Sequence, residues 1–259
     1  MICAGIDSGS RAIKIVIFDA VKNKIIAHGV ADQGVEQDAI AKRLFEKLLS
    51  ENNITRDRVK RIVATGYGRN IISFADTTIT EISCHAVGVR HLAPDAMTVI
   101  DIGGQDSKLI RIADGGHIRD FAMNDRCAAG TGRFLEVVAV RLGVKLHDLG
   151  KIAKKSHNPA VISSMCVVFA ETEIIGLLAS GAKPEDIVAG VQASIASRVA
   201  GMAGRNITPP IYFTGGAALV PGMKDALSKV LNHDVTVVSD PQMTGALGAA
   251  ILATKNAKL

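Results

Sequence analysis

The sequence contains no tryptophan, and aromatic residues make up only 3% of its 259 residues. Single-stranded nucleic acid stacks on aromatic side chains, so their scarcity argues against a protein that binds it. The formal net charge is +5, yet no run of Lys and Arg forms a basic tail or stripe. The positive charge suits an anionic nucleotide or an acidic partner as well as nucleic acid, and we expect no nucleic-acid partner.

Long hydrophobic runs are also missing. No stretch of about 18 uncharged apolar residues occurs, so no membrane span is predicted. The segment 1–7 lacks the basic start and long apolar core of a signal peptide and is predicted to be a strand. We therefore expect a cytoplasmic protein. In that compartment its few cysteines are expected to be reduced, and to serve structure or metal binding rather than disulfides: Cys3, Cys84, Cys127 and Cys166.

Two of the cysteines, Cys127 and Cys166, stand where helices are predicted to begin. Backbone N–H groups at a helix start favour negative charge and lower the pKa of a thiol, which favours metal binding. Two thiolates supply only half of a four-cysteine iron–sulfur cluster, and a two-fold dimer would supply the other half. Cys3 and Cys84 lie in apolar segments and are predicted to pack in the core.

Hydrophobic periodicity predicts an α/β chain in which one pattern of strands and helices occurs twice. Predicted strands cover 2–6, 13–18, 25–30, 61–65, 97–102, 108–112, 117–121, 211–214 and 235–238. Predicted helices cover 36–50, 81–92, 127–142, 166–178, 184–205 and 243–253. We expect two similar lobes, 1–95 and 96–241, with a nucleotide cleft between them. The second lobe is expected to carry Cys127 and Cys166. A C-terminal helix, 242–254, is expected to pack back on the first lobe.

Both predicted lobes begin with a strand that ends in aspartate and is followed by glycine. In the first loop, Ser8, Gly9 and Ser10 are expected to approach a phosphate, since glycine permits a tight turn and the hydroxyls donate. Asp7 is expected to hold Mg²⁺ through water, because a carboxylate repels phosphate. Taken alone, this segment is also compatible with an ordinary hairpin turn.

The second loop repeats this design. Gly103 and Gly104 would present N–H groups to the β- and γ-phosphates, and Asp101 would bind Mg²⁺ or orient water. Gln105 or Asp106 would position the attacking water, since phosphoryl transfer depends mainly on positioning and charge neutralisation.

Two further glycine-containing segments follow. Gly215, Gly216 and Ala217 are small enough for a base or ribose to lie against their backbone, and segment 245–250 is predicted to let two helices approach closely. None of the four segments matches the single-loop phosphate motif or the dinucleotide fingerprint. Arg133 is expected to contact phosphate or a second subunit, although a solvated arginine is an alternative.

The order of these motifs resembles the actin, sugar-kinase and heat-shock-protein ATPase superfamily. Segments 64–70, 81–86, 100–106 and 123–134 look like the activators, or component A, of 2-hydroxyacyl-CoA dehydratases. The wider family includes the ATPase subunits of benzoyl-CoA reductase. The resemblance covers nearly the whole chain.

This resemblance implies two actin-like (ribonuclease H-like) lobes that bind ATP or ADP with Mg²⁺, with Gly132 and Arg133 near the nucleotide. It implies an oxygen-sensitive homodimer in which Cys127 and Cys166 of both copies hold one [4Fe–4S] cluster. ATP turnover would drive a low-potential electron from ferredoxin or flavodoxin into an iron–sulfur dehydratase or reductase. A metal-free small-molecule kinase and an actin-like scaffold remain the alternatives.

Overall fold

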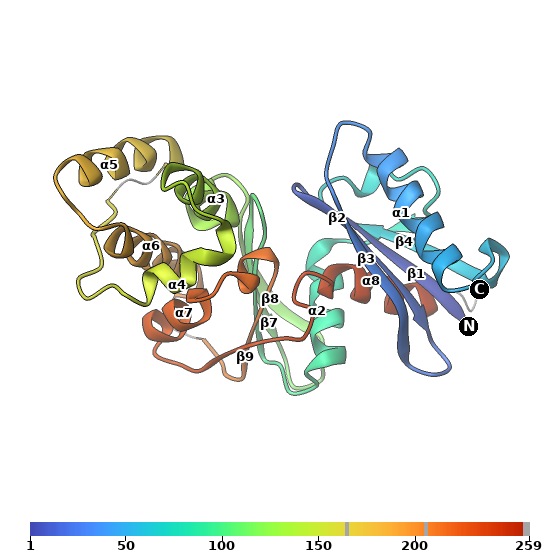
Figure 1. Ribbon diagram of the computed structural model, residues 1–259. Helices are drawn as coiled ribbons and strands as arrows, with labels where there is room; N and C mark the ends of the chain where they lie inside the picture. The colour runs from blue at the N-terminus through green and yellow to red at the C-terminus, as the bar shows by residue number, and fades with distance from the viewer. Residues whose placement is uncertain (164–165, 205–206, 256–259) are drawn as a thin grey trace. The chain divides into compact units, whose positions relative to one another are not determined.

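The computed structural model describes residues 1–163, 166–204 and 207–255 (Figure 1). The chain divides into two compact units. Unit 1 contains Met1–Asp95 and Gln242–Leu259, and unit 2 contains Ala96–Pro241. Each unit is built on one mixed five-stranded sheet with helices, which confirms the predicted α/β class.

The sheet of unit 1 has the order β3-β2-β1-β4-β5, in which β1, β2 and β3 are antiparallel neighbours and β4 and β5 run parallel to β1. Its strands are β1 (Ile2–Ser8), β2 (Ala12–Asp19), β3 (Lys24–Asp32), β4 (Val59–Thr65) and β5 (Thr77–Thr78). Its helices are α1 (Gln37–Glu51), α2 (Glu81–Leu92) and α8 (Thr244–Lys255), with 3₁₀ turns at Arg56–Arg58 and Arg69–Ile71.

Both faces of this sheet are buried, because the side chains of β2 alternate between two hydrophobic clusters. Ile13, Ile15 and Ile17 pack with Phe45 and other residues of α1 on one face. Val16 packs with residues of α8 on the other face. Figure 1 shows α1 apart from α2 and α8, which lie together.

Close contact between α2 and α8 depends on glycine. A Cβ added to Gly248 would lie 2.6 Å from the carbonyl carbon of Cys84, and one added to Gly88 would lie 2.8 Å from that of Thr244. Real Cβ atoms do not approach so closely. The predicted role of segment 245–250 in helix–helix packing is therefore confirmed.

The sheet of unit 2 has the order β10-β9-β6-β7-β8. Counted from β8, this is the third, second, first, fourth and fifth strand of the unit, which is the order found in unit 1. Its strands are β6 (Thr98–Ile102), β7 (Ser107–Ile112), β8 (Ile118–Asn124), β9 (Ile211–Thr214) and β10 (Val235–Val237). Strands β6, β7 and β8 are antiparallel neighbours, and β9 and β10 continue the sheet in parallel with β6. The two units therefore share one topology, as the repeated pattern predicts.

The helices of unit 2 pack around one core, which includes Ile100, Leu109, Phe134 and Val191. They are α3 (Gly132–Arg141), α4 (Leu149–Ala153), α5 (Val167–Ala179), α6 (Pro184–Ala203) and α7 (Met223–Leu231), with 3₁₀ turns at Ala128–Gly130, Leu146–Asp148 and Gly216–Leu219.

The structure corrects the predicted helix over 127–142. Its α-helical part, α3, begins only at Gly132, whereas Cys127 has extended backbone before a short 3₁₀ turn. The start is set by Thr131, whose hydroxyl caps α3 by accepting the N–H of Arg133. Helices α4 and α7 are short and were not predicted, and the predicted helix end at Arg205 lies outside the described residues.

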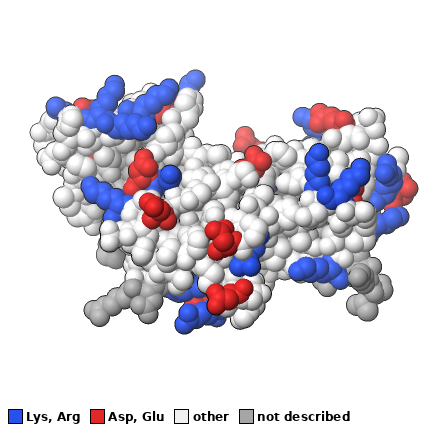
Figure 2. All heavy atoms as spheres, turned by 90° about the horizontal axis from the view of Figure 1, so that it is seen from below, with Lys and Arg blue, Asp and Glu red and all other residues white. Residues whose placement is uncertain are grey.

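No helix in the described part of the chain is long and apolar enough to cross a membrane. On the face shown in Figure 2, Lys and Arg side chains form several separate groups with acidic side chains among them.

Candidate functional site

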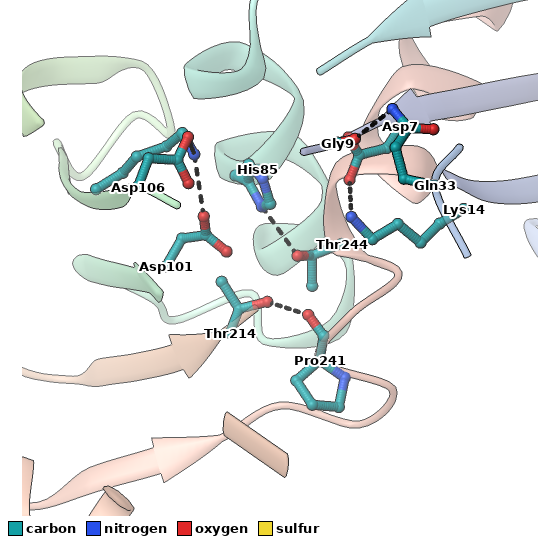
Figure 3. Close-up of polar contacts among 11 residues, drawn as sticks. Asp7, Gly9, Lys14, Gln33, His85, Asp101, Asp106, Thr214, Pro241 and Thr244 are labelled. Carbon is teal, nitrogen blue, oxygen red and sulfur yellow. Dashed lines mark hydrogen bonds and ion pairs between the residues drawn. The ribbon is translucent and has the colours of Figure 1, made fainter. Parts of the chain in front are cut away.

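The predicted phosphate loop of unit 1 lies in the β1–β2 hairpin. Asp7 and Lys14 are paired across the two strands, and Lys14 Nζ lies 3.1 Å from Asp7 Oδ2 (Figure 3). The Asp7 side chain is only 7% exposed. The turn itself is held by Gly9, whose N–H donates to the Ala12 carbonyl at 3.1 Å and whose carbonyl accepts from Gln33 Nε2 at 2.8 Å.

The segment that follows β4, residues 66–68, packs against this loop at Ser8. The Gly68 N–H donates to the Ser8 carbonyl at 2.8 Å. Gly66 has a φ of +92°, and a Cβ there would lie 2.5 Å from the Ser8 carbonyl oxygen. Ser8 is wholly buried by this packing, whereas Gly9 and Ser10 are half-buried at the tip of the turn. Ser10 is therefore the more accessible of the two predicted hydroxyl donors.

A buried histidine lies next to Asp7. His85 Nδ1 is 3.0 Å from Thr244 Oγ1, where α2 meets the start of α8 (Figure 3). A Cβ added to Gly245 would lie 3.1 Å from Asp7 Oδ2 and 3.2 Å from His85 Nε2. His85 is therefore a residue of α2 whose ring nitrogen Nδ1 has a hydrogen-bond partner.

The predicted phosphate loop of unit 2 repeats the arrangement of unit 1 with stronger burial. Asp101 and Lys108 are paired across β6 and β7, and Lys108 Nζ lies 3.3 Å from Asp101 Oδ2. Both side chains are 3% exposed. The same ammonium lies 2.7 Å from Asp106 Oδ2, so one buried cation is paired with two carboxylates.

The two lysines are site residues that the sequence analysis missed. A signal for them exists, because a lysine stands seven positions after the aspartate in both repeats, as Asp7–Lys14 and Asp101–Lys108. Hairpins of equal length bring both pairs opposite one another across the strands. Buried carboxylates at these positions need a cation, because an unpaired charge away from water is very costly.

The two residues predicted to position water have different surroundings. The Asp106 carboxylate points back into its own loop, towards Lys108 and towards Gly103, whose added Cβ would lie 2.5 Å from Asp106 Oδ1. Gln105 is exposed at the tip of the loop. Gln105 is thus accessible to a substrate water, whereas Asp106 holds the loop in shape.

The third predicted loop packs directly against Asp101. Gly215 has a φ of +89°, and a Cβ there would lie 2.7 Å from Asp101 Oδ1. Pro241 accepts both the Gly215 N–H, at 2.9 Å, and the Thr214 hydroxyl, at 2.6 Å (Figure 3). Gly216 begins a 3₁₀ turn after this loop. The methyl group of Ala217 is buried in the core of unit 2, so only its backbone is available to a ligand.

The predicted phosphate loop of unit 2, residues 101–106, is called the Asp101 loop here, and it is also hydrogen-bonded to the start of α3. The N–H groups of Gly132 and Arg133 donate to the carbonyls of Gly103 and Gly104, both at 2.9 Å. The Arg133 side chain forms an ion pair with Glu136 on its own helix, at 3.0 Å. Gly132 and Arg133 therefore shape the loop through their backbone, while the guanidinium lies at the surface.

The four cysteines fall into two classes by burial. Cys3 and Cys84 are wholly buried, and burial raises the pKa of both thiols, that of Cys84 to about 12. Their predicted place in the core is confirmed, and thiols held protonated in this way are poor metal ligands. Cys127 is half-buried and Cys166 is exposed, and neither is in a disulfide.

The surroundings of the two accessible thiols differ. Cys166 is the N-cap residue of α5, as predicted, and Ser164 and Met165 before it lie outside the described residues. Cys127 is held by the Asn124 side chain, which accepts the Cys127 N–H at 3.1 Å and donates to its carbonyl at 2.8 Å.

A protein-family model matches nearly the whole chain. The model of the BadF/BadG/BcrA/BcrD ATPase family matches residues 4–253. The chain belongs to this ATPase family. The resemblance to dehydratase activators that the motifs indicate is thereby confirmed at the level of the family.

Relatives in this ATPase family are similar over their full length. The 2-hydroxyisocaproyl-CoA dehydratase activator of Clostridioides difficile is 43% identical over 263 residues, which cover 100% of this chain and 97% of the relative. The (R)-2-hydroxyglutaryl-CoA dehydratase activating ATPase of Acidaminococcus fermentans is 42% identical over 255 residues, which cover 98% of this chain and 97% of the relative.

Solved structures confirm the actin-like fold of this family member. The activator of the 2-hydroxyisocaproyl-CoA dehydratase from Clostridium difficile, solved with bound ADPNP, has a TM-score of 0.93 at 42% identity and covers 100% of this chain and 96% of that chain. A ROK family glucokinase from Streptomyces griseus has a TM-score of 0.61 at 12% identity, covering 98% of this chain and 100% of that chain, and shares the fold alone.

The accessible cysteines are the candidate ligands for the cluster that the sequence motifs imply. Among the described residues, no group of three or more His, Cys, Asp or Glu side chains could hold a metal ion. A four-cysteine cluster needs two ligands besides Cys127 and Cys166. Cys127 and Cys166 are both accessible and lie on the unit that also carries Asp101, so they are the residues that would hold half of such a cluster.

Proposed function

We propose that this family member is an ATP-dependent reductive activator. In this proposal two copies share one [4Fe–4S] cluster, held by Cys127 and Cys166 of each copy. ATP binding and hydrolysis drive one low-potential electron into a partner 2-hydroxyacyl-CoA dehydratase or a related reductase. Ferredoxin or flavodoxin supplies that electron. The full-length identity of 43% to a dehydratase activator supports the choice of partner class.

The phosphate loops supply the nucleotide chemistry in this proposal. Asp7 and Asp101 would hold Mg²⁺, and the glycine N–H groups of each loop would donate to the phosphates. Lys14 and Lys108 remain bound to these carboxylates and keep them in place, as the 3.1 and 3.3 Å ion pairs indicate. Gln105, exposed at its loop tip, orients the water that attacks the γ-phosphate. Gly215 and Gly216 lie against the nucleoside.

The cysteines supply the redox chemistry. When bound, a [4Fe–4S] cluster accepts and releases single electrons at low potential. Cys166 is exposed and Cys127 half-exposed, which suits ligands at a surface where a second copy and a redox partner approach. Apolar side chains close to Cys166 in sequence are unusually exposed, at 84% for Val161, 68% for Val168 and 69% for Phe169. Covering them favours association with a second copy.

The energetic requirement of this function is modest. For one electron, about 59 mV of driving force corresponds to about 1.4 kcal/mol. ATP and ADP need only differ in their affinity for two conformations by a few kcal/mol to change the potential by a useful amount. The hydrogen bonds that join the Asp101 loop to the start of α3 are a physical route for that difference.

The accessibility of Cys127 and Cys166, set against the burial of Cys3 and Cys84, is the observation that carries this proposal. It is tested by iron analysis after anaerobic purification. We expect about four iron atoms per dimer and a broad visible absorbance, as for other [4Fe–4S] proteins. Cys127→Ala should lose the iron, whereas the matched control Cys84→Ala should keep it.

Two results would contradict the assignment. Full iron content in the Cys127→Ala variant would exclude Cys127 as a ligand. A colourless, iron-free native chain that phosphorylates a small molecule would instead identify the metal-free kinase.

A further inference from the structure

We infer that Thr131 and Asn124 are positioning residues that couple the Asp101 loop to Cys127 within a single unit. The inference rests on the proposed function but goes beyond it. It states that the state of the nucleotide reaches Cys127 through a continuous set of hydrogen bonds, and that the described hydrogen bonds of Cys166 are not part of this set.

The first part of the link is the Thr131 hydroxyl. Thr131 is wholly buried, and its Oγ1 lies 3.1 Å from the Gly104 carbonyl and 2.8 Å from the Ala128 carbonyl. Its single proton therefore lies between the predicted phosphate loop and the 3₁₀ turn that follows Cys127. Together with the N–H groups of Gly132 and Arg133, it fixes the position of the Gly103–Gly104 backbone relative to this turn.

The second part is the side chain of Asn124. It bonds both the N–H and the carbonyl of Cys127, so it sets the position of this residue's backbone. Asn124 is the last residue of β8 and is paired in register with Ser107, which directly follows the Asp101 loop. A Cβ added to Gly130 would lie 3.2 Å from Asn124 Nδ2, so the turn packs tightly on the amide.

The described contacts of Cys166 and of the residues around it are mostly with α5 itself. Its carbonyl accepts the N–H of Ala170 on its own helix, at 2.8 Å. Ser163, three residues earlier, donates its N–H and hydroxyl to Glu173 of α5, at 2.9 and 2.6 Å. Glu171 of α5 forms an ion pair with Arg141 at the end of α3. The described hydrogen bond of Cys166 thus lies within its own helix, whereas Cys127 is held by Asn124 and is followed by the turn that Thr131 joins to Gly104.

This link predicts that the reactivity of the Cys127 thiol depends on the bound nucleotide, and that this can be measured without the cluster. If a γ-phosphate moves Gly103 and Gly104, the turn carrying Cys127 must move with them, and the reactivity of its thiol changes. The test uses the full chain without iron and measures the rate at which iodoacetamide alkylates each cysteine, resolved by peptide mass spectrometry. Rates are compared with MgADP and with MgADPNP.

In the native chain, the Cys127 rate should differ about fivefold or more between the two nucleotides, the lower end of measured couplings between sites. Thr131→Val keeps the shape but removes the hydroxyl, and it should reduce this difference by a factor of about five, since one hydrogen bond contributes about that factor. Thr131→Ser restores the hydroxyl and should recover the difference.

Thr98→Val is the matched control. Thr98 is also wholly buried, and its hydroxyl donates to the Thr208 carbonyl at 2.7 Å, at the end of β6 away from Asp101. Its loss should leave the nucleotide dependence of Cys127 intact. The same dependence should appear in the loaded dimer as a nucleotide-induced shift of the cluster's reduction potential, which Thr131→Val should abolish.

The inference is overturned if Thr131→Val keeps the full difference, or if the Cys127 rate ignores nucleotide in a chain that calorimetry shows to bind ADPNP. Failure of the proposed function looks different, because it leaves the chain without iron or without nucleotide binding in those separate measurements.

Discussion

At the residue scale, the two Asp–Lys pairs perform the same task in different surroundings. Asp101 and Lys108 are both 3% exposed, whereas Lys14 is 17% exposed beside Asp7. If the lysine were removed, water could therefore solvate the remaining aspartate in part in unit 1 but very little in unit 2. The pair in unit 2 should contribute more to stability than its counterpart.

Replacing Lys108 by Met tests this difference. The change leaves the buried Asp101 carboxylate without the ammonium that lies 3.3 Å from it, and breaking such a pair costs about 3 to 5 kcal/mol. Urea denaturation should show a loss in that range for Lys108→Met and a smaller loss for Lys14→Met. Equal losses in the two variants would mean that burial does not distinguish the pairs.

At the scale of the element, α2 and α8 approach closely because glycines lie at their crossing. A Cβ at Gly248 would meet backbone atoms of Cys84, which cannot move aside without shifting the helix. The strand beneath shows the same dependence, since a Cβ at Gly5 would lie 2.9 Å from the Cβ of Ala249. The three elements form the layer that holds Asp7 and His85.

Gly248→Ala should therefore destabilise the protein by about 3 kcal/mol, because overpacking a tight core forces backbone shifts. The control is Gly201→Ala on α6, where an added Cβ meets nothing within 4 Å. It should stabilise the protein slightly, by up to about 1 kcal/mol, because alanine favours the helix. Thermal unfolding of both variants measures the contrast, and a neutral Gly248→Ala would show that α2 and α8 can separate freely.

At the scale of the whole molecule, the proposed cluster would link two copies, because it takes ligands from both. In the proposed dimer each copy supplies Cys127 and Cys166, so metal binding and association would be thermodynamically linked. Removing iron should then weaken the dimer.

Analytical ultracentrifugation before and after anaerobic chelation measures this linkage. We expect the dissociation constant to rise about tenfold or more, equivalent to about 1.4 kcal/mol. Cys84→Ala should behave as the native chain does, because Cys84 is buried in unit 1. An unchanged dissociation constant would show that the cluster does not bridge the copies.

Much of the fold could be predicted because its signals are local. The alternation of Ile13, Ile15 and Ile17 with Val16 identifies a strand buried on both faces, and the apolar face of 184–203 identifies a core helix. Short helices such as α7 escaped prediction, because its nine residues make only about two and a half turns.

The sequence by itself determined the repeated α/β pattern, the two Asp–Gly loops and the separation of Cys3 and Cys84 from Cys127 and Cys166, since each depends on neighbouring residues. Only the tertiary structure decided that Lys108 serves two carboxylates and that α3 begins at Gly132 rather than Cys127. The physical reason is that hydrogen bonds from Thr131, Gly132 and Arg133 reach carbonyls nearly thirty residues away, on a loop that only strand pairing brings within reach.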